Sequence, residues 1–202
     1  MKPIRSHAGT AVPVNRTSID TDVIIPAKHC LRVTRTGFSE HLFDAWRSDP
    51  TFALNDPRRR DATFLVAGRD FGTGSSREAA VWALQEWGFR VVVSSRFGDI
   101  FYNNCGKAGL LAARIDDDAL VNLMRAVENR PDTRVEVDLT TKSLGWDDGD
   151  DRFRTTIDID DFTCRRMIEG LDDIDLTLGH EEAIRDYERI NSQRFPRKAS
   201  TT

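Results

Sequence analysis

One short stretch of the chain gathers the residue types best suited to binding an anion. Residues 72–78 read Gly-Thr-Gly-Ser-Ser-Arg-Glu. Gly72 and Gly74 let the backbone approach a ligand closely, because glycine has no Cβ. Arg77 adds a planar guanidinium group that suits a carboxylate or a phosphate. This composition predicts an anion-binding turn.

The same stretch predicts the start of a helix. Ser75 at the N-cap and Glu78 three residues later match the capping box, and an apolar helical face follows them. The free N–H groups at a helix N-terminus carry partial positive charge and attract anions. Ser75 could act as a base in such a field, but its hydroxyl would need a second positive centre nearby. A capped helix with an incidental arginine explains the pattern equally well.

Two other enzyme classes share parts of this pattern. A dinucleotide-binding turn carries a third glycine, where this chain has Arg77. Ser94, Ser95 and Arg96 are nevertheless similar to a site for a 2′-phosphate, so a stand-alone nucleotide-binding domain stays open as an alternative. A serine hydrolase requires the pattern Gly-x-Ser-x-Gly, which residues 72–76 do not supply.

Two segments nearer the N-terminus could take part in binding. Residues 19–22 (Ile-Asp-Thr-Asp) form either a carboxylate pair for a cation or a turn that hydrogen-bonds its own backbone. Residues 28–36 are basic and read as a loop, either solvated or selecting a substrate. Cys105 is expected to be a packed side chain rather than a nucleophile. The four histidines stand apart in the sequence, and we expect them at the surface: His7, His29, His41 and His180.

The elements that would position the turn form a βαβ unit. It comprises a strand at 63–67, a helix at 76–87 and a strand at 89–93, and should be parallel and right-handed. Before this unit, patterning predicts a weak strand at 4–14, a helix at 40–46 and turn material at 56–61. After it, patterning predicts a short segment at 99–104 ending in a turn at 106–109, then a strand at 110–113 and a helix at 117–128. The C-terminal part is expected to hold a hairpin of 134–139 and 152–159, joined by a turn at 145–149, and helices at 161–168 and 181–190.

Composition limits the class of protein. The chain has 202 residues, 39% of them hydrophobic, and a formal net charge of −4, so it lacks the basic footprint of a nucleic-acid binder. We expect one domain at residues 1–193 and a disordered tail at residues 194–202. No secretory leader or membrane-spanning stretch is recognisable. The three cysteines lie far apart, which indicates a cytoplasmic protein with free thiols that cannot hold a Cys-ligated cluster alone.

Four segments, in order, resemble the small subunits of 3-isopropylmalate dehydratases, a family of aconitase-type hydro-lyases. They are residues 19–26, 68–78, 96–104 and 170–178. The resemblance implies an α/β fold like the swivel domain of aconitase, with β/β/α layers around the central βαβ unit. It also implies interconversion of 2-isopropylmalate and 3-isopropylmalate by dehydration and rehydration, in leucine biosynthesis, and activity only with a large subunit.

The resemblance also implies roles for individual residues. Ser75 would be the catalytic base, and Ser76, Arg77, Arg32 and Thr34 would bind the small dicarboxylate substrate. No metal ligand is expected on this chain. A [4Fe–4S] cluster would sit on the large subunit, where one iron acts as a Lewis acid and provides the second positive centre. No nucleic acid or membrane partner is expected. The residues expected to support the site are Asp20, Thr21, Asp22, Gly72, Gly74 and Glu78.

Some positions depart from the family's usual pattern. Ala79 stands where histidine is common, Val23 where glutamine is frequent, and His29-Cys30 where the family usually has a Phe-Leu pair. The small subunit of a paralogous hydro-lyase, acting on another alkylmalate or maleate, is therefore a second interpretation. A non-catalytic regulatory subunit is a third.

Overall fold

The computed structural model describes residues 1–30, 36–75 and 77–191. The chain divides into two compact units, residues 1–170 and residues 171–202, and each is considered by itself. Among the described residues, no helix has both the length and the apolar character needed to cross a membrane.

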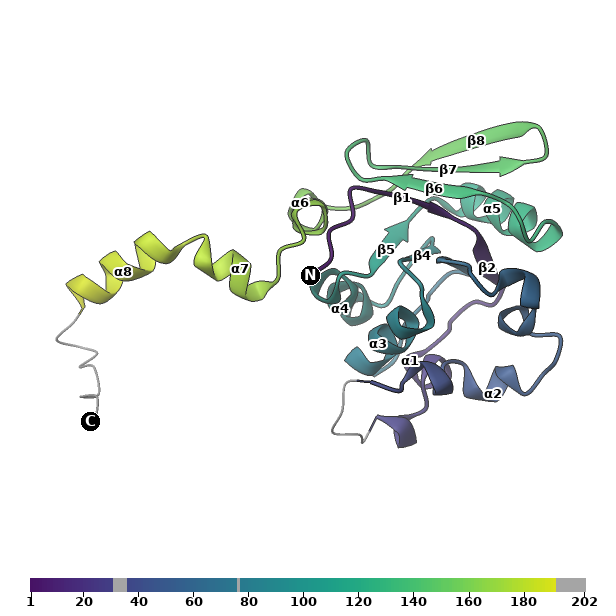
Figure 1. The fold of residues 1–202 in the computed structure, drawn as a ribbon, viewed down its shortest axis with the longest axis horizontal. Coiled ribbons are helices and arrows are strands. Elements are labelled where there is room, and N and C mark those ends of the chain that lie inside the picture. The colour runs from purple at the N-terminus through teal and green to yellow at the C-terminus, as the bar shows by residue number, and fades with distance from the viewer. Residues whose placement is uncertain (31–35, 76, 192–202) are drawn as a thin grey trace. The chain divides into compact units, whose positions relative to one another are not determined.

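A four-stranded parallel sheet forms the centre of the first unit (Figure 1). Nearly all residues of its strands are buried, as expected for a parallel sheet that is covered on both faces. The strands in spatial order are β2 (Ala11–Val14), β3 (Phe64–Ala67), β4 (Val91–Ser94) and β5 (Leu111–Arg114). The expected βαβ unit is confirmed, since β3 and β4 are parallel neighbours joined by α3 (Glu78–Trp87).

A second sheet is antiparallel, and here two sequence predictions were wrong. The expected hairpin of 134–139 and 152–159 does not form, because residues 145–148 of its expected turn belong to a strand that lies between them and pairs with both. Leu144 and Trp146 of this strand are buried in the core. The weak strand expected at 4–14 is two strands in different sheets. The antiparallel sheet has the order β1 (Ser6–Gly9), β6 (Val135–Asp138), β7 (Ser143–Asp148) and β8 (Asp151–Thr156).

Helices cover the two faces of the parallel sheet differently. Figure 1 shows α3 and α4 (Asp99–Ala108) on one side, and α5 (Asp117–Asn129) with the antiparallel sheet on the other. A hydrophobic core lies on each face of the sheet, and successive strand residues point into opposite cores. Leu65 packs towards α3 and α4, and Phe64 packs towards α5 and the antiparallel sheet. This arrangement confirms the predicted β/β/α layers.

Several boundaries differ from the sequence prediction. The segment expected to end at 104 continues as helix to Ala108, because Phe101 and Cys105 bury one face of it. Residues 56–61, expected to be linker, hold Arg59, which is 5% exposed and donates to the main-chain oxygens of Ala11 (2.8 Å) and Val127 (2.7 Å).

The other helices described in this unit are α1 (Thr21–Ile24), α2 (Asp44–Arg47), α6 (Asp161–Glu169) and 3₁₀ turns at Ala27–His29, Ser39–His41, Ala53–Asn55 and Pro57–Arg59.

The described part of the second unit, residues 171–191, is mainly helical. It contains α7 (Asp173–Leu178), which sequence patterning missed, and α8 (Glu181–Ile190), which it predicted. Asp172 caps α7 through a full capping box with Asp175. The assignment of residues 1–193 to one domain stays a prediction, and the tail predicted at 194–202 lies outside the described residues.

Candidate functional site

The glycine-rich turn follows β3, at the carboxyl end of the parallel sheet. Gly72 and Gly74 adopt left-handed backbone angles, with φ of 73° and 84°. A Cβ at position 72 would overlap the ring of Phe101 on α4, and one at position 74 would lie 3.2 Å from the Cβ of Asp20. The backbone conformation and the close approach of α4 therefore both require glycine at position 72.

Residues 19–21 hold one side of this turn. The Gly72 N–H donates to the Ile19 carbonyl (2.7 Å), and the Thr21 N–H donates to the Thr73 carbonyl (2.9 Å). The buried Thr21 hydroxyl donates to the Ser75 carbonyl at 2.6 Å. Thr21 is thus a direct support for the main chain of Ser75.

Residues 96–98 hold the other side. The Phe71 N–H donates to the Arg96 carbonyl (3.0 Å), and the Gly98 N–H donates to the Phe71 carbonyl (2.9 Å). The rings of Phe71 and Phe101 pack edge to face at a centroid distance of 5.3 Å. The turn is therefore fixed from both sides before it reaches Ser75.

The predicted capping box at Ser75 and Glu78 was wrong. The helix α3 begins at Glu78, and its N-cap is Arg77, which is extended (φ −140°, ψ 109°) and makes no side-chain cap. Hydrogen bonds to residues 19–21 keep the chain out of helical conformation through Ser75. Ser75 therefore stands just outside the helix, while Arg77 occupies the helix start and its positive field.

Arg77 is bound to Asp22. Its Nη2 donates to Asp22 Oδ2 at 2.9 Å, and its Nη1 contacts Asp22 Oδ1. The hydrogen bond from Arg77 lowers the pKa of the Asp22 carboxyl. Nη1 is buried and makes no well-aligned hydrogen bond within the described residues. The guanidinium is thus held in place through both of its terminal nitrogens by one carboxylate.

The two carboxylates of residues 19–22 have separate tasks. Asp20 is the N-cap of α1, and its Oδ1 accepts from the Val23 N–H at 3.0 Å, as the turn interpretation predicts. Asp22 pairs with Arg77 and also accepts from the Ala27 N–H at 3.2 Å. The start of the predicted substrate loop is therefore tied to the same carboxylate as Arg77.

The predicted site residues are only partly brought together. Asp20, Thr21, Asp22, Gly72, Gly74 and Arg77 form one connected group, and Ser75 lies exposed at its edge. Glu78 is exposed at the start of α3. Ser76, Arg32 and Thr34 lie outside the described residues, so their predicted contacts are not located.

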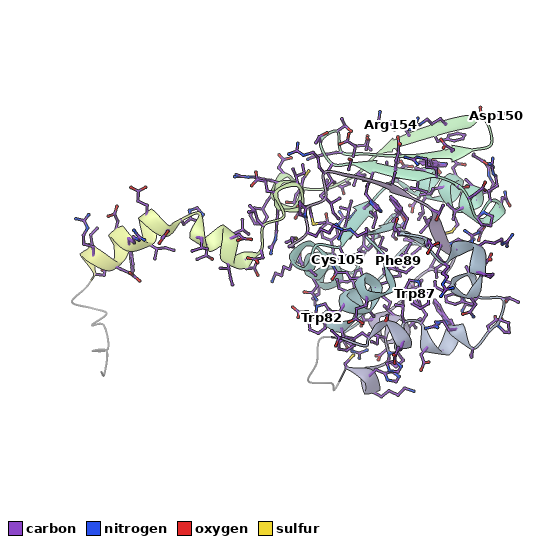
Figure 2. All side chains as sticks on the ribbon, in the orientation of Figure 1. Trp82, Trp87, Phe89, Cys105, Asp150 and Arg154 are labelled. Atoms are coloured by element: carbon purple, nitrogen blue, oxygen red, sulfur yellow. The ribbon has the colours of Figure 1, made fainter. Side chains whose placement is uncertain are left out.

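The three cysteines do not meet. Cys105 is fully buried on α4, on the α3 side of the parallel sheet (Figure 2), and burial raises the pKa of its thiol well above the usual value. Cys164 is buried in the other core, and Cys30 is half-buried beside Asp22 and Arg77. These thiols do not fit a Cys-ligated cluster, because two of them are packed on opposite faces of one sheet. Cys105 is a packed side chain, as predicted.

Sequence reasoning missed one group of side chains. The rings of His29 and His41 are stacked with centroids 3.6 Å apart, and Asp44 lies beside them. Eleven residues lie between the two histidines, and no helical or strand periodicity relates them. Only the close return of the chain from Ala27–His29 to Ser39–His41 brings them together.

Comparison with known proteins identifies the family over most of the length of the chain. The Aconitase C-terminal domain matches residues 1–118, and the C-terminal domain of 3-isopropylmalate dehydratase small subunits matches residues 173–197. A 3-isopropylmalate dehydratase small subunit from Acidothermus cellulolyticus is 54% identical over 188 residues, which is 93% of each chain. The chain belongs to the 3-isopropylmalate dehydratase small-subunit family.

Other family members agree in length and fold. The small subunit from Nocardioides sp. is 52% identical over 188 residues, again 93% of each chain. A crystal structure of 3-isopropylmalate dehydratase from Methanocaldococcus jannaschii has a TM-score of 0.64 and 23% identity, and covers 91% of this chain and 99% of that chain. At that identity the likeness supports the fold, which is that of the aconitase swivel domain.

Proposed function

We propose that this chain is the small subunit of a 3-isopropylmalate dehydratase, which interconverts 2-isopropylmalate and 3-isopropylmalate in leucine biosynthesis. The observation that carries the proposal is the connected group at the glycine-rich turn. It holds Arg77 through Asp22 and holds the main chain of Ser75 through Thr21. Family membership supports the reaction, and this geometry supports the roles of the residues in it.

Arg77 would bind a substrate carboxylate. Its side chain is 17% exposed, so part of it can meet a ligand while Asp22 holds the guanidinium in place. A charge-assisted hydrogen bond to a carboxylate is about twice as strong as a neutral one. Arg77 also lies at the start of α3, where an anion is favoured. Ser76, Arg32 and Thr34 are proposed as further substrate contacts.

Ser75 would take the proton from the carbon next to the carboxylate. The hydroxyl leaves from the neighbouring carbon, so the proton taken by Ser75 and the departing hydroxyl together make up the water that is lost. Return of both to the maleate intermediate, with their positions exchanged, completes the isomerisation. Ser75 is exposed, which suits a group that must meet a substrate held by a second subunit. Its fixed main chain limits the movement of the hydroxyl before that meeting.

The partner would be the large subunit of the family, in a heterodimer or a larger assembly. The resemblance implies a [4Fe–4S] cluster on that subunit, and the positions of Cys30, Cys105 and Cys164 give no support for one on this chain. This chain would contribute proton removal and carboxylate binding. A cytoplasmic location, and the absence of nucleic-acid and membrane partners, belong to the same proposal.

A paralogous hydro-lyase is the second candidate. His29 and Cys30 replace the usual Phe-Leu pair at the start of the predicted substrate loop, and Ala79 replaces the common histidine. A changed loop with an unchanged turn would keep the reaction and alter the accepted alkyl group. Another alkylmalate or maleate would then be the preferred substrate.

The test is reconstitution with the large subunit encoded by the same organism. The purified complex is assayed by the ultraviolet absorbance of the maleate intermediate, with a series of 2-alkylmalates as substrates. Preference for the isopropyl compound supports the proposal, and preference for another alkyl group supports the paralogue. A complex whose turnover does not depend on Ser75 or Arg77 would support a regulatory subunit instead.

A further inference from the structure

A cluster of metal-ligand side chains lies outside the site described above. His29 ends one 3₁₀ turn, His41 ends another, and Asp44 is the first residue of α2. One ligand atom from each lies within 4.8 Å of the other two. His29 Nε2 is 3.5 Å from Asp44 Oδ2, and the two imidazoles are stacked at 3.6 Å with an angle of 7° between their planes.

His29 contributes a buried ring nitrogen that lacks a hydrogen bond within the described part of the chain. Its Nε2 atom is buried and has no hydrogen-bond partner among the described residues. Buried polar atoms are normally hydrogen-bonded, and one that is not calls for an explanation such as an ion. The atom is close to Asp44 Oδ2, at a distance too long for a good hydrogen bond.

We propose that His29, His41 and Asp44 bind one divalent cation, Zn²⁺ in the first place. Imidazole nitrogen and carboxylate oxygen are both ligands of Zn²⁺. Three protein ligands leave a fourth position for water, as in zinc sites that are not closed by the protein. The inference does not depend on the dehydratase activity.

Binding requires a small rearrangement of the side chains. Ligand atoms of a tetrahedral Zn²⁺ site lie about 3.3–3.6 Å apart, since each metal–ligand bond is about 2.0–2.2 Å. The ring of His41 must also turn out of the stack, because the lone pairs of two parallel rings do not converge. His41 and Asp44 are only half-buried, so both have room for this movement.

Neighbouring groups compete weakly for the ligands. Lys28 Nζ lies 3.8 Å from Asp44 Oδ2, but this side chain is 70% exposed and can turn into solvent when a cation binds. Cys30 is next to His29 in sequence, and its thiol points to the Pro26 carbonyl at 3.9 Å.

The backbone before Asp44 is held in an unusual conformation. Phe43 has a φ of 51°, which is rare for a bulky residue. Its N–H donates to the Ile24 carbonyl at 2.8 Å, and its ring stacks on Trp46 with centroids 5.4 Å apart. The buried Phe43 side chain thus fixes the point from which Asp44 extends towards the histidines. Such strain often occurs at functional sites.

A bound cation would join two parts of the chain near the proposed active site. His29 lies two residues after Ala27, whose N–H donates to Asp22, the partner of Arg77. His41 lies on the far side of residues 30–40 in sequence. Zn²⁺ would hold the two ends of this stretch together.

The test is metal binding to the untagged full-length chain, purified without added metal. Zn²⁺ is titrated by calorimetry, and Co²⁺ is used as a spectroscopic probe of the ligand geometry. We expect one site per chain. His29→Gln, His41→Gln and Asp44→Asn should each weaken binding at least about tenfold, because even groups outside the first ligand shell have effects of this size. The matched control is His180→Gln, which removes an imidazole from the second unit and should leave the affinity unchanged.

Three outcomes would overturn the proposal. The first is no Zn²⁺ binding by a folded wild-type chain. The second is equal affinity in wild type and His29→Gln. The third is loss of the site in Cys30→Ser with no loss in Asp44→Asn, which would assign the metal to the thiol. Circular dichroism of each variant shows whether the chain is still folded.

Discussion

Replacing Thr21 by valine tests whether the support of Ser75 matters for catalysis. The substitution keeps the shape of a buried side chain, 2% exposed, and removes only the hydroxyl that donates to the Ser75 carbonyl at 2.6 Å. A typical hydrogen bond contributes about 0.5–1.5 kcal/mol, and an acceptor left without its partner costs about 1–3 kcal/mol. We therefore expect the free energy of unfolding to fall by about 1–2 kcal/mol, measured by urea denaturation.

The catalytic effect of this substitution should exceed its effect on stability. A misplacement of about 1 Å can reduce a rate by about 100-fold, so we expect kcat of the reconstituted complex to fall about 10–100-fold. KM should change less, because Arg77 keeps its bond to Asp22. Steady-state kinetics with 2-isopropylmalate give both constants.

Thr133→Val is the matched control. Thr133 is also buried, at 3% exposure, and its hydroxyl also donates to a main-chain oxygen, that of Ala126 at 3.1 Å. It supports α5 and lies outside the turn. The control should lose similar stability and keep its kcat. Equal kcat values for Thr21→Val and Thr133→Val would refute the reasoning.

Two further predictions concern the turn and its charge pair. Gly72→Ala should lower the free energy of unfolding by about 1–3 kcal/mol more than Gly88→Ala. Both positions have positive φ, but only a Cβ at 72 overlaps another side chain, and urea denaturation of the two variants measures the difference. The pKa of Asp22 is lowered by Arg77, so the contribution of this pair should be complete above about pH 4 and lost as the pH falls through the lowered pKa. Carboxyl NMR titration measures this directly, and an Asp22 pKa at or above the usual value would contradict the pairing.

Much of the fold could be read from the sequence, because its central unit follows local rules. The apolar strands, the helical face of α3 and Gly88 at its end identify the βαβ unit without knowledge of the rest of the chain. The βαβ pattern and the family resemblance together were sufficient for the layered architecture.

The remaining errors arise where distant segments decide local conformation. Residues 75–78 match a capping box, but hydrogen bonds to residues 19–21 hold the turn up to the Ser75 carbonyl, Arg77 is extended, and the helix starts at Glu78. Gly145 reads as a turn residue, yet the burial of its neighbours makes it part of a strand. Sequence spacing could not show that His29 and His41 meet, because no helical or strand periodicity relates the two positions.

Arg77 and Asp22 show how the structure refines the proposed site. Arg77 was expected to bind the substrate and Asp22 to support the site, but their hydrogen bond was not expected, because 55 positions separate them. The pair fixes the orientation of a long arginine side chain at the start of α3.

The rate of Ser75→Ala in the reconstituted complex tests the central claim most directly. A general base contributes about 10²–10⁴-fold to a rate, so we expect kcat to fall by that factor. Size-exclusion chromatography should show that the variant still assembles with the large subunit, since Ser75 is exposed and its main-chain bond to Thr21 remains. An assembled complex that turns over 2-isopropylmalate at the wild-type rate would contradict the assignment of Ser75 as the base.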